Sequence, residues 1–208
     1  GTPAIMNGLH ADLGAVVWVT SAYLLAYAVP LLVSGRLGDR YGPKNVYLVG
    51  LAVFTLASLG CALSDSLPML LFFRAIQGLG GGGLAPVEQS ILADTFPPEK
   101  RAGAFALYGL TVVTAPAMGP ALGGWITDNY SWHWIFLINL PFGALSLFLV
   151  SVFVQEPQAV REDRRKARAE GRGIDWVGFG LAALALGSLQ VVLDRAVIDD
   201  GFWSPLVT

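Results

Sequence analysis

Three polar side chains interrupt one of the most apolar stretches of this sequence. Arg74 stands near the start of residues 70–93, Gln77 follows almost one helical turn later, and Glu88 lies further along. An unpaired guanidinium in the middle of a membrane costs about 2.5 to 3.5 kcal/mol, so Arg74 should face protein or water. The alternative is an Arg74 side chain that extends to the outer membrane surface, because only about 6 Å of helix rise separates it from Leu70.

Glu88 and Asp94 add two carboxylates to the same stretch. Fourteen residues on a continuous helix rise about 21 Å, which excludes a direct bond between Arg74 and Glu88. The two side chains lie on nearly the same helix face and can belong to one polar pathway, or Glu88 pairs with a cation on another helix. Asp94 precedes Pro97 and Pro98, where it caps a helix or pairs with a basic residue of the following loop.

Glycine and proline crowd two of the apolar stretches. In lipid a helical glycine lets neighbouring helices approach closely, and each interior proline removes one donor from the helix. Close packing or a bend is therefore predicted in both. The residues are Gly78, Gly80, Gly81, Gly82, Gly83 and Pro86 in the first, and Pro116, Gly119, Pro120, Gly123 and Gly124 in the second.

A basic segment follows the first apolar stretch. Its glycines and Pro43 permit a tight turn between two helices, and Asp39 can accept hydrogen bonds from the amides of a neighbouring helix start. A turn that only carried positive charge would need neither this carboxylate nor the spaced glycines. The segment contains Gly35, Arg36, Gly38, Asp39, Arg40, Gly42, Pro43 and Lys44.

Long apolar helices are the elements that must position these residues. Of the 208 residues, 54% are hydrophobic and 13% are charged, which is too apolar for a water-soluble surface. Six stretches approach the roughly 20 residues that a helix needs to cross a membrane. They show no strand-like alternation, so we expect an all-α, polytopic membrane bundle. The stretches are residues 16–33, 46–63, 70–93, 104–126, 135–154 and 176–193.

The basic residues fall on one side of the predicted membrane. Eleven of the thirteen Lys and Arg residues lie in the connections after the first, third and fifth stretches. Because basic loops stay in the cytoplasm, loops 34–45, 94–103 and 155–174 are predicted to be cytoplasmic. Gly1 is then outside, although residues 1–14 hold neither a signal peptide nor a spanning length. We therefore expect a fragment that begins at the outer end of a first helix.

Cysteine and histidine give no sign of a metal or catalytic site. Cys61 is the one cysteine and lies within an apolar stretch, where packing is its expected role. His10 and His133 have no second ligand at metal spacing, and no nucleophile motif is present. No cofactor and no nucleic-acid partner is expected.

Taken in order, these motifs resemble those of the major facilitator superfamily. The basic segment resembles its G-x-x-x-D-R-x-G-[RK]-[RK] motif, with Pro43 where the family usually has a basic residue. Arg74-x-x-Gln77-Gly78 resembles the fourth-helix motif, residues 119–124 resemble the fifth-helix antiporter motif, and residues 132–141 are similar to the opening of the sixth helix in exporters. The short loop before residue 175 favours the drug:proton antiporter branch of the fourteen-helix EmrB/QacA type.

The resemblance implies a domain organisation. Residues 1–154 would hold the N-terminal transporter half, with helices two to six and the outer end of the first. Residues 155–174 would form a basic cytoplasmic loop, and residues 175–208 an extra linking transmembrane helix and the start of the next loop. The substrate cavity of this fold lies between two six-helix halves, so this segment would supply one wall.

The resemblance also implies export of amphipathic or cationic compounds across the cytoplasmic membrane, driven by the proton gradient. Arg74 would tune or relay the proton, while Gln77 and Glu88 would line the polar route. The basic segment, with Asp94, would latch the cytoplasmic side, and the antiporter motif would let two helices seal against proton leak. Membrane lipid would surround the bundle, and a periplasmic adaptor with an outer-membrane channel stays open as a partner.

Three alternatives remain at this point. The first is a proton-coupled symporter of a nutrient, against which the antiporter motif argues. The second is a static packing or sensing subunit, because glycine and proline also occur in bundles that do not move. The third is an intramembrane enzyme, for which no catalytic cluster is visible.

Overall fold

A computed structural model describes residues 2–9 and 11–154, together with nine positions between 162 and 188. The chain divides into two units, Gly1–Arg172 and Gly173–Thr208, and all the helices described below belong to the first. The predicted cytoplasmic loop 155–174 and linking segment 175–208 fall almost entirely outside the described residues. Both therefore stay predictions.

The described part of the first unit is helical, which confirms the predicted all-α class. No strand occurs among residues 2–9 and 11–154. The helices are α1 (Thr2–Leu9), α2 (Leu13–Tyr41), α3 (Pro43–Ala62), α4 (Leu67–Gly81), α5 (Leu84–Thr95), α6 (Pro98–Asn129), α7 (Trp134–Leu137) and α8 (Asn139–Phe153).

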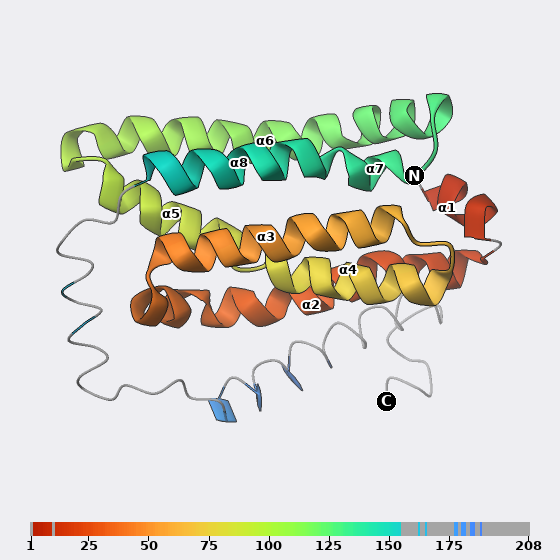
Figure 1. Cartoon of the computed structure of the whole chain (residues 1–208), viewed down its shortest axis with the longest axis horizontal. Coiled ribbons are helices and arrows are strands. Elements are labelled where there is room, and N and C mark those ends of the chain that lie inside the picture. Colours follow the sequence, from red (N-terminus) through yellow and green to blue (C-terminus); the bar gives the residue numbers. More distant parts are fainter. Residues whose placement is uncertain are drawn as a thin grey trace, which may run out of the picture. The chain divides into compact units, whose positions relative to one another are not determined.

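The long helices of the first unit run side by side, and the chain reverses direction at the α2–α3, α3–α4, α5–α6 and α6–α7 connections but not between α4 and α5 or between α7 and α8 (Figure 1). One end carries the α2–α3 and α5–α6 connections and the end of α8, and the other carries the α1–α2, α3–α4 and α6–α7 connections. Helix α4 packs against both α2 and α3, and α8 packs against α3. The described basic residues of the predicted cytoplasmic loops before α8 thus gather at one end, as a spanning bundle requires.

Four of these helical segments are long and apolar enough to cross a membrane: Gly14–Tyr41, Pro43–Ala62, Pro98–Asn129 and Trp134–Phe153. The predicted single helix over 70–93 is wrong, because the chain forms α4 and α5 with a turn at Gly82 and Gly83. Pro86 lacks the amide hydrogen that would bond the carbonyl of Gly82. The break between α7 and α8 at Ile138 has the same cause, because Pro141 cannot donate to Leu137.

The predicted loops 34–45 and 94–103 are also much shorter than expected. Helix α2 continues to Tyr41 and α3 begins at Pro43, so Gly42 alone connects them, with φ of 89°. Only glycine enters that backbone region without strain, and proline suits the first position of a helix. Between α5 and α6 only residues 96–97 are not helical. Charged residues ended the apolar stretches, but helices continue beyond the lipid because their backbone bonds are internal.

The glycine run of α4 brings three helices into close contact, which confirms the predicted close packing there. A Cβ atom at Gly78 would lie 2.9 Å from the Ala26 Cβ of α2 and would collide with the Tyr23 carbonyl. On the other face, a Cβ at Gly80 would lie 2.5 Å from the Phe54 amide nitrogen of α3. Backbone atoms cannot move aside as side chains do, so larger residues would separate α4 from α2 and α3.

Two buried apolar clusters hold the bundle together. One lies toward the end opposite the basic residues and joins α1, α2, α3, α4 and α7 through residues such as Leu70, Cys61 and Trp132. The other lies toward the basic end and joins Tyr47 and Leu51 of α3 to Val87 of α5. Helix α6 contributes no buried residue to either cluster.

Candidate functional site

Arg74 lies half-buried on α4 with its guanidinium among groups of neighbouring helices. Its Nε donates to the Val19 carbonyl of α2 at 3.0 Å, and its Nη1 donates to Gln77 Oε1 at 2.8 Å. The guanidinium carbon lies 4.2 Å from the centre of the Tyr23 ring and 5.8 Å from that of Phe136. Both distances are in the range of cation–π attraction. The guanidinium thus faces the bundle, and the alternative of an extension to the membrane surface is not the observed conformation.

Gln77 continues this network into α3. It is 2% exposed, and its Nε2 donates to Ser58 Oγ at 2.7 Å. Ser58 is fully buried and also lies 3.4 Å from Asn139 Nδ2 at the start of α8. The structure therefore brings Arg74 and Gln77 together and adds two polar side chains to them.

Glu88 does not belong to this network. It lies on α5, half-buried, with Tyr47 of α3 and Tyr108 of α6 among its polar neighbours. Tyr27 of α2 is coupled electrostatically to both Glu88 and Tyr108. A carboxylate with tyrosines of three other helices nearby is a second polar cluster, and it can attract a cation.

The basic segment is a helix–turn–helix at the end of the bundle. Lys44 connects this segment to another helix: its Nζ donates to the carbonyls of Ser151 at 2.8 Å and Val154 at 2.6 Å. These carbonyls end α8, where a helix has unsatisfied acceptors and a partial negative charge. Lys44 therefore ties the start of α3 to the end of α8.

The other residues of the predicted latch lie nearby on exposed surface. Asp39 and Arg40 belong to the last turns of α2 and are both exposed, and Arg40 lies 5.8 Å from the centre of the Tyr41 ring. Asp94 is exposed near the end of α5, where Arg101 of α6 is its electrostatic neighbour. Gly35 has open space beside it, whereas Gly42 forms the turn itself. The described contacts do not join Asp94 to the basic segment.

The antiporter motif lies on the exposed face of α6. Pro116 and Pro120 are inside the helix without ending it, and nothing in the described chain lies within 4 Å of a Cβ placed at Gly119, Gly123 or Gly124. The predicted close approach of a second helix to this face therefore has no counterpart among the described residues. The small residues leave a smooth surface that another helix can meet.

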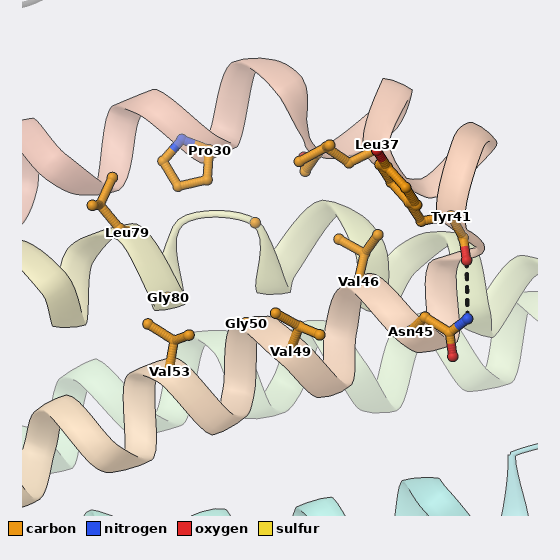
Figure 2. A pocket seen from close by; sticks show the side chains of 12 residues that line it. Pro30, Leu37, Tyr41, Asn45, Val46, Val49, Gly50, Val53, Leu79 and Gly80 are labelled. Atoms are coloured by element: carbon orange, nitrogen blue, oxygen red, sulfur yellow. Dashed lines mark hydrogen bonds between the residues drawn. The ribbon is translucent and has the colours of Figure 1, made fainter.

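An apolar pocket of about 720 Å³ lies between α2, α3 and the α4–α5 junction. Figure 2 shows Pro30 and Leu37 of α2 facing Val49 of α3 across it. The amide of Asn45 at its edge is turned away, because its Nδ2 donates to the Tyr41 carbonyl at 3.0 Å. Ser34 and Tyr41 also line the pocket, and the rest of its wall is apolar. The volume of the pocket is in the range that accommodates drug-sized molecules.

Sequence reasoning missed several partners of the predicted residues. Ser58 and Tyr23 are single polar residues in apolar stretches, and nothing in their spacing points to Arg74. Tyr47 and Tyr108 likewise are far from Glu88 in sequence. Asn139 carried a signal, because it belongs to the segment that resembles the sixth-helix opening of exporters. An uncharged side chain gives little warning of a buried role, since it inserts in a membrane at small cost.

Comparison with known sequences shows which family this chain resembles. The profile described as Major Facilitator Superfamily matches residues 2–207. The chain is 42% identical over 205 residues to the MFS-type transporter Rv1250 of Mycobacterium tuberculosis, which covers 99% of this chain and 33% of that protein. It is also 42% identical over 202 residues to the multidrug export protein EmrB of Escherichia coli, covering 97% of this chain and 38% of that one. The chain thus spans between a third and two fifths of the length of these relatives.

Solved structures agree with the fold. The chain superposes on the partially occluded, inward-open xylose transporter XylE from E. coli with a TM-score of 0.68, at 15% identity, over 95% of this chain and 55% of that one. At this identity the likeness concerns the fold alone. Because the family profile matches nearly the whole sequence and the helices adopt this fold, the chain belongs to the major facilitator superfamily of multi-pass inner-membrane transporters rather than to a family of enzymes.

Proposed function

We propose that the complete transporter exports amphipathic or cationic compounds in exchange for protons, with the proton gradient as its energy source. The observation that carries the proposal is a half-buried Arg74 whose described partners are a carbonyl, an amide oxygen and two aromatic rings. None of these groups neutralises its charge. A relative at 42% identity is named a multidrug export protein, which supports export as the direction of transport.

Arg74 tunes protonation rather than carrying the proton. A guanidinium does not release its proton in proteins, so it acts through its field. With neutral partners its charge favours the ionised form of any carboxylate that comes to face it, and disfavours a second cation nearby. A conformational change that moves Arg74 toward or away from a carboxylate would therefore bind or release a proton.

We assign the carboxylate of Glu88, on α5, to the substrate path. The neighbouring Tyr27, Tyr47 and Tyr108 supply aromatic rings and hydroxyl groups near a negative charge. Organic cations bind such surroundings through charge and cation–π attraction. The apolar pocket between α2, α3 and α4 supports substrates with a large apolar part. The alternative role of Glu88 is to pair with a cation on another helix. Substitution of Glu88 tests this role as well.

The ends of the helices supply the latch and the seal in this proposal. The basic segment, with Asp94, closes the cytoplasmic side, and Lys44 transmits movement between α3 and α8. The small residues of α6 receive a second helix in the complete protein and exclude protons there. A periplasmic adaptor and an outer-membrane channel stay predicted partners.

The test uses the full-length protein in energised inverted vesicles. Addition of a cationic dye should release lumenal protons from wild-type vesicles, and Arg74→Ala should abolish the release. Arg74→Lys retains the charge but not the forked donors, so it should retain part of the release. Glu88→Gln should reduce the proton release caused by cationic compounds more than the release caused by neutral compounds.

Two results would overturn the proposal. If none of a broad panel of compounds caused proton release, the proposed export function would be excluded and a nutrient symporter would be favoured. Full release from Arg74→Ala would remove Arg74 from coupling. A static bundle is tested separately with single cysteines at the two ends of the helices, because only alternating access makes substrate change their labelling in opposite directions.

A further inference from the structure

The hydroxyl group of Ser58 is the meeting point of three helices. It accepts a hydrogen bond from Gln77 Nε2 of α4 at 2.7 Å and lies 3.4 Å from Asn139 Nδ2 of α8, a longer and weaker contact. Its own hydrogen is donated to the Phe54 carbonyl of α3 at 2.8 Å. A serine hydroxyl has one donor and two acceptor positions, so all of them are used here.

This arrangement determines which end of the Gln77 amide faces Arg74. Because Nε2 is held by Ser58, Oε1 points the other way and accepts from Arg74 Nη1 at 2.8 Å. The Cys61 thiol lies 4.0 Å from the same oxygen as a weak donor. If the amide turned over, its NH₂ group would face the guanidinium, and two donors would oppose each other.

We propose that Ser58, supported by Asn139, is a positioning residue that sets the place of the Arg74 charge through Gln77. The chain of contacts runs from α8 through α3 to α4 and ends on the Val19 carbonyl of α2. A shift of α8 or α3 against α4 would release Gln77 and free Arg74 to face another partner. The inference rests on the proposed function for its meaning in transport, but the positioning itself can be tested without transport.

A purely structural serine is the alternative, and the chain offers a matched control for it. Ser64 follows α3 and is also almost fully buried, but among the described residues its Oγ bonds only to the Gly60 carbonyl, at 2.8 Å. Ser58→Ala and Ser64→Ala therefore each remove one buried hydroxyl and one bond to a backbone carbonyl. Only Ser58→Ala also releases Gln77.

The first measurement is the rate at which phenylglyoxal modifies Arg74 in the purified full-length protein, followed by peptide mass spectrometry. Ser58→Ala should raise this rate about fivefold, the factor that corresponds to one hydrogen bond of about 1 kcal/mol. Asn139→Ala should raise it less, because its contact is longer, and Ser64→Ala should leave it unchanged. In a Gln77→Leu background, which itself raises the rate, Ser58→Ala should add nothing, because the effect passes through Gln77.

The second measurement is the pH midpoint of substrate-induced proton release in inverted vesicles. Ser58→Ala should shift this midpoint, whereas Ser64→Ala should change only the amount of folded protein. An Arg74 modification rate that Ser58→Ala and Asn139→Ala leave at the wild-type value, or that Ser64→Ala raises equally, overturns the positioning role. If wild-type vesicles release no protons, the proposed function fails while the modification rates still decide the inference.

Discussion

Replacement of Gly78 by alanine tests the close approach of α4 to α2. The new methyl group would lie 2.9 Å from Ala26 Cβ and 3.0 Å from the Tyr27 nitrogen, and it would collide with the Tyr23 carbonyl. Ordinary contacts need about 3.5 Å or more, so the helices must separate by several tenths of an ångström or more. Overpacking of this kind costs about 1 to 3 kcal/mol. Alanine recovers about 1 kcal/mol as the better helix former, which leaves a net loss of up to about 2 kcal/mol.

Gly103→Ala is the matched control for this prediction. Gly103 is also helical and lies on exposed α6, and no atom of the described part of the chain lies within 4 Å of a Cβ placed there. Here alanine should gain helix propensity without a clash and leave the protein as stable or up to about 1 kcal/mol more stable. The two substitutions should therefore move stability in opposite directions.

The assay is thermal unfolding of the full-length protein in detergent, followed by tryptophan fluorescence. Gly78→Ala should lower the apparent melting temperature, and Gly103→Ala should hold or raise it. Gly78→Leu should be worse than Gly78→Ala, because a longer side chain meets the same backbone. A Gly78→Ala protein as stable as the Gly103→Ala protein would refute the close approach of the two helices.

Three further predictions follow from the same contacts. Lys44→Met should destabilise the protein by about 1 kcal/mol in thermal unfolding, because two carbonyls at the end of α8 lose their cation. Lys100→Met, at an exposed residue, should leave the stability unchanged, and equal effects of the two substitutions would contradict the contact. Pro86→Ala restores the donor for the Gly82 carbonyl, so hydrogen exchange across residues 82–86 should slow, and unchanged exchange would mean that the glycines alone keep the turn open. The Cys61 thiol is fully buried and should react with a maleimide only after denaturation, so labelling of the native protein would show that the cluster around Leu70 opens.

The sequence predicted the class of the fold well because lipid imposes simple requirements. A spanning helix must be long and apolar, and basic residues must stay on one side, so the stretches 16–33, 46–63 and 104–126 each lie mainly within a single helix. The helix ends were less predictable. Hydropathy changes where lipid ends, whereas a helix ends where backbone bonding ends, which is why α2 runs on to Tyr41 and α6 begins at Pro98.

The residues of the candidate site also fall into two groups, those that the sequence indicated and those that it did not. Arg74 stood out from the sequence because a charge is costly among apolar residues, and Gln77 followed from its spacing of three residues, which placed it on the same face. Their partners come from other helices. Which carbonyl, hydroxyl or ring meets the guanidinium depends on how far α2, α3 and α4 approach each other.

By itself, the sequence determined a helical membrane bundle, the gathering of its described basic residues at one end and the charged residues that such a bundle must accommodate, because each of these follows from local composition and the cost of charge in lipid. The tertiary structure alone decided that Ser58 holds Gln77, that Glu88 lies among tyrosines instead of continuing the Arg74 network, and that Lys44 binds the end of α8. These contacts join residues far apart in the chain, and a hydrogen bond depends on tenths of an ångström that only the packing of whole helices sets.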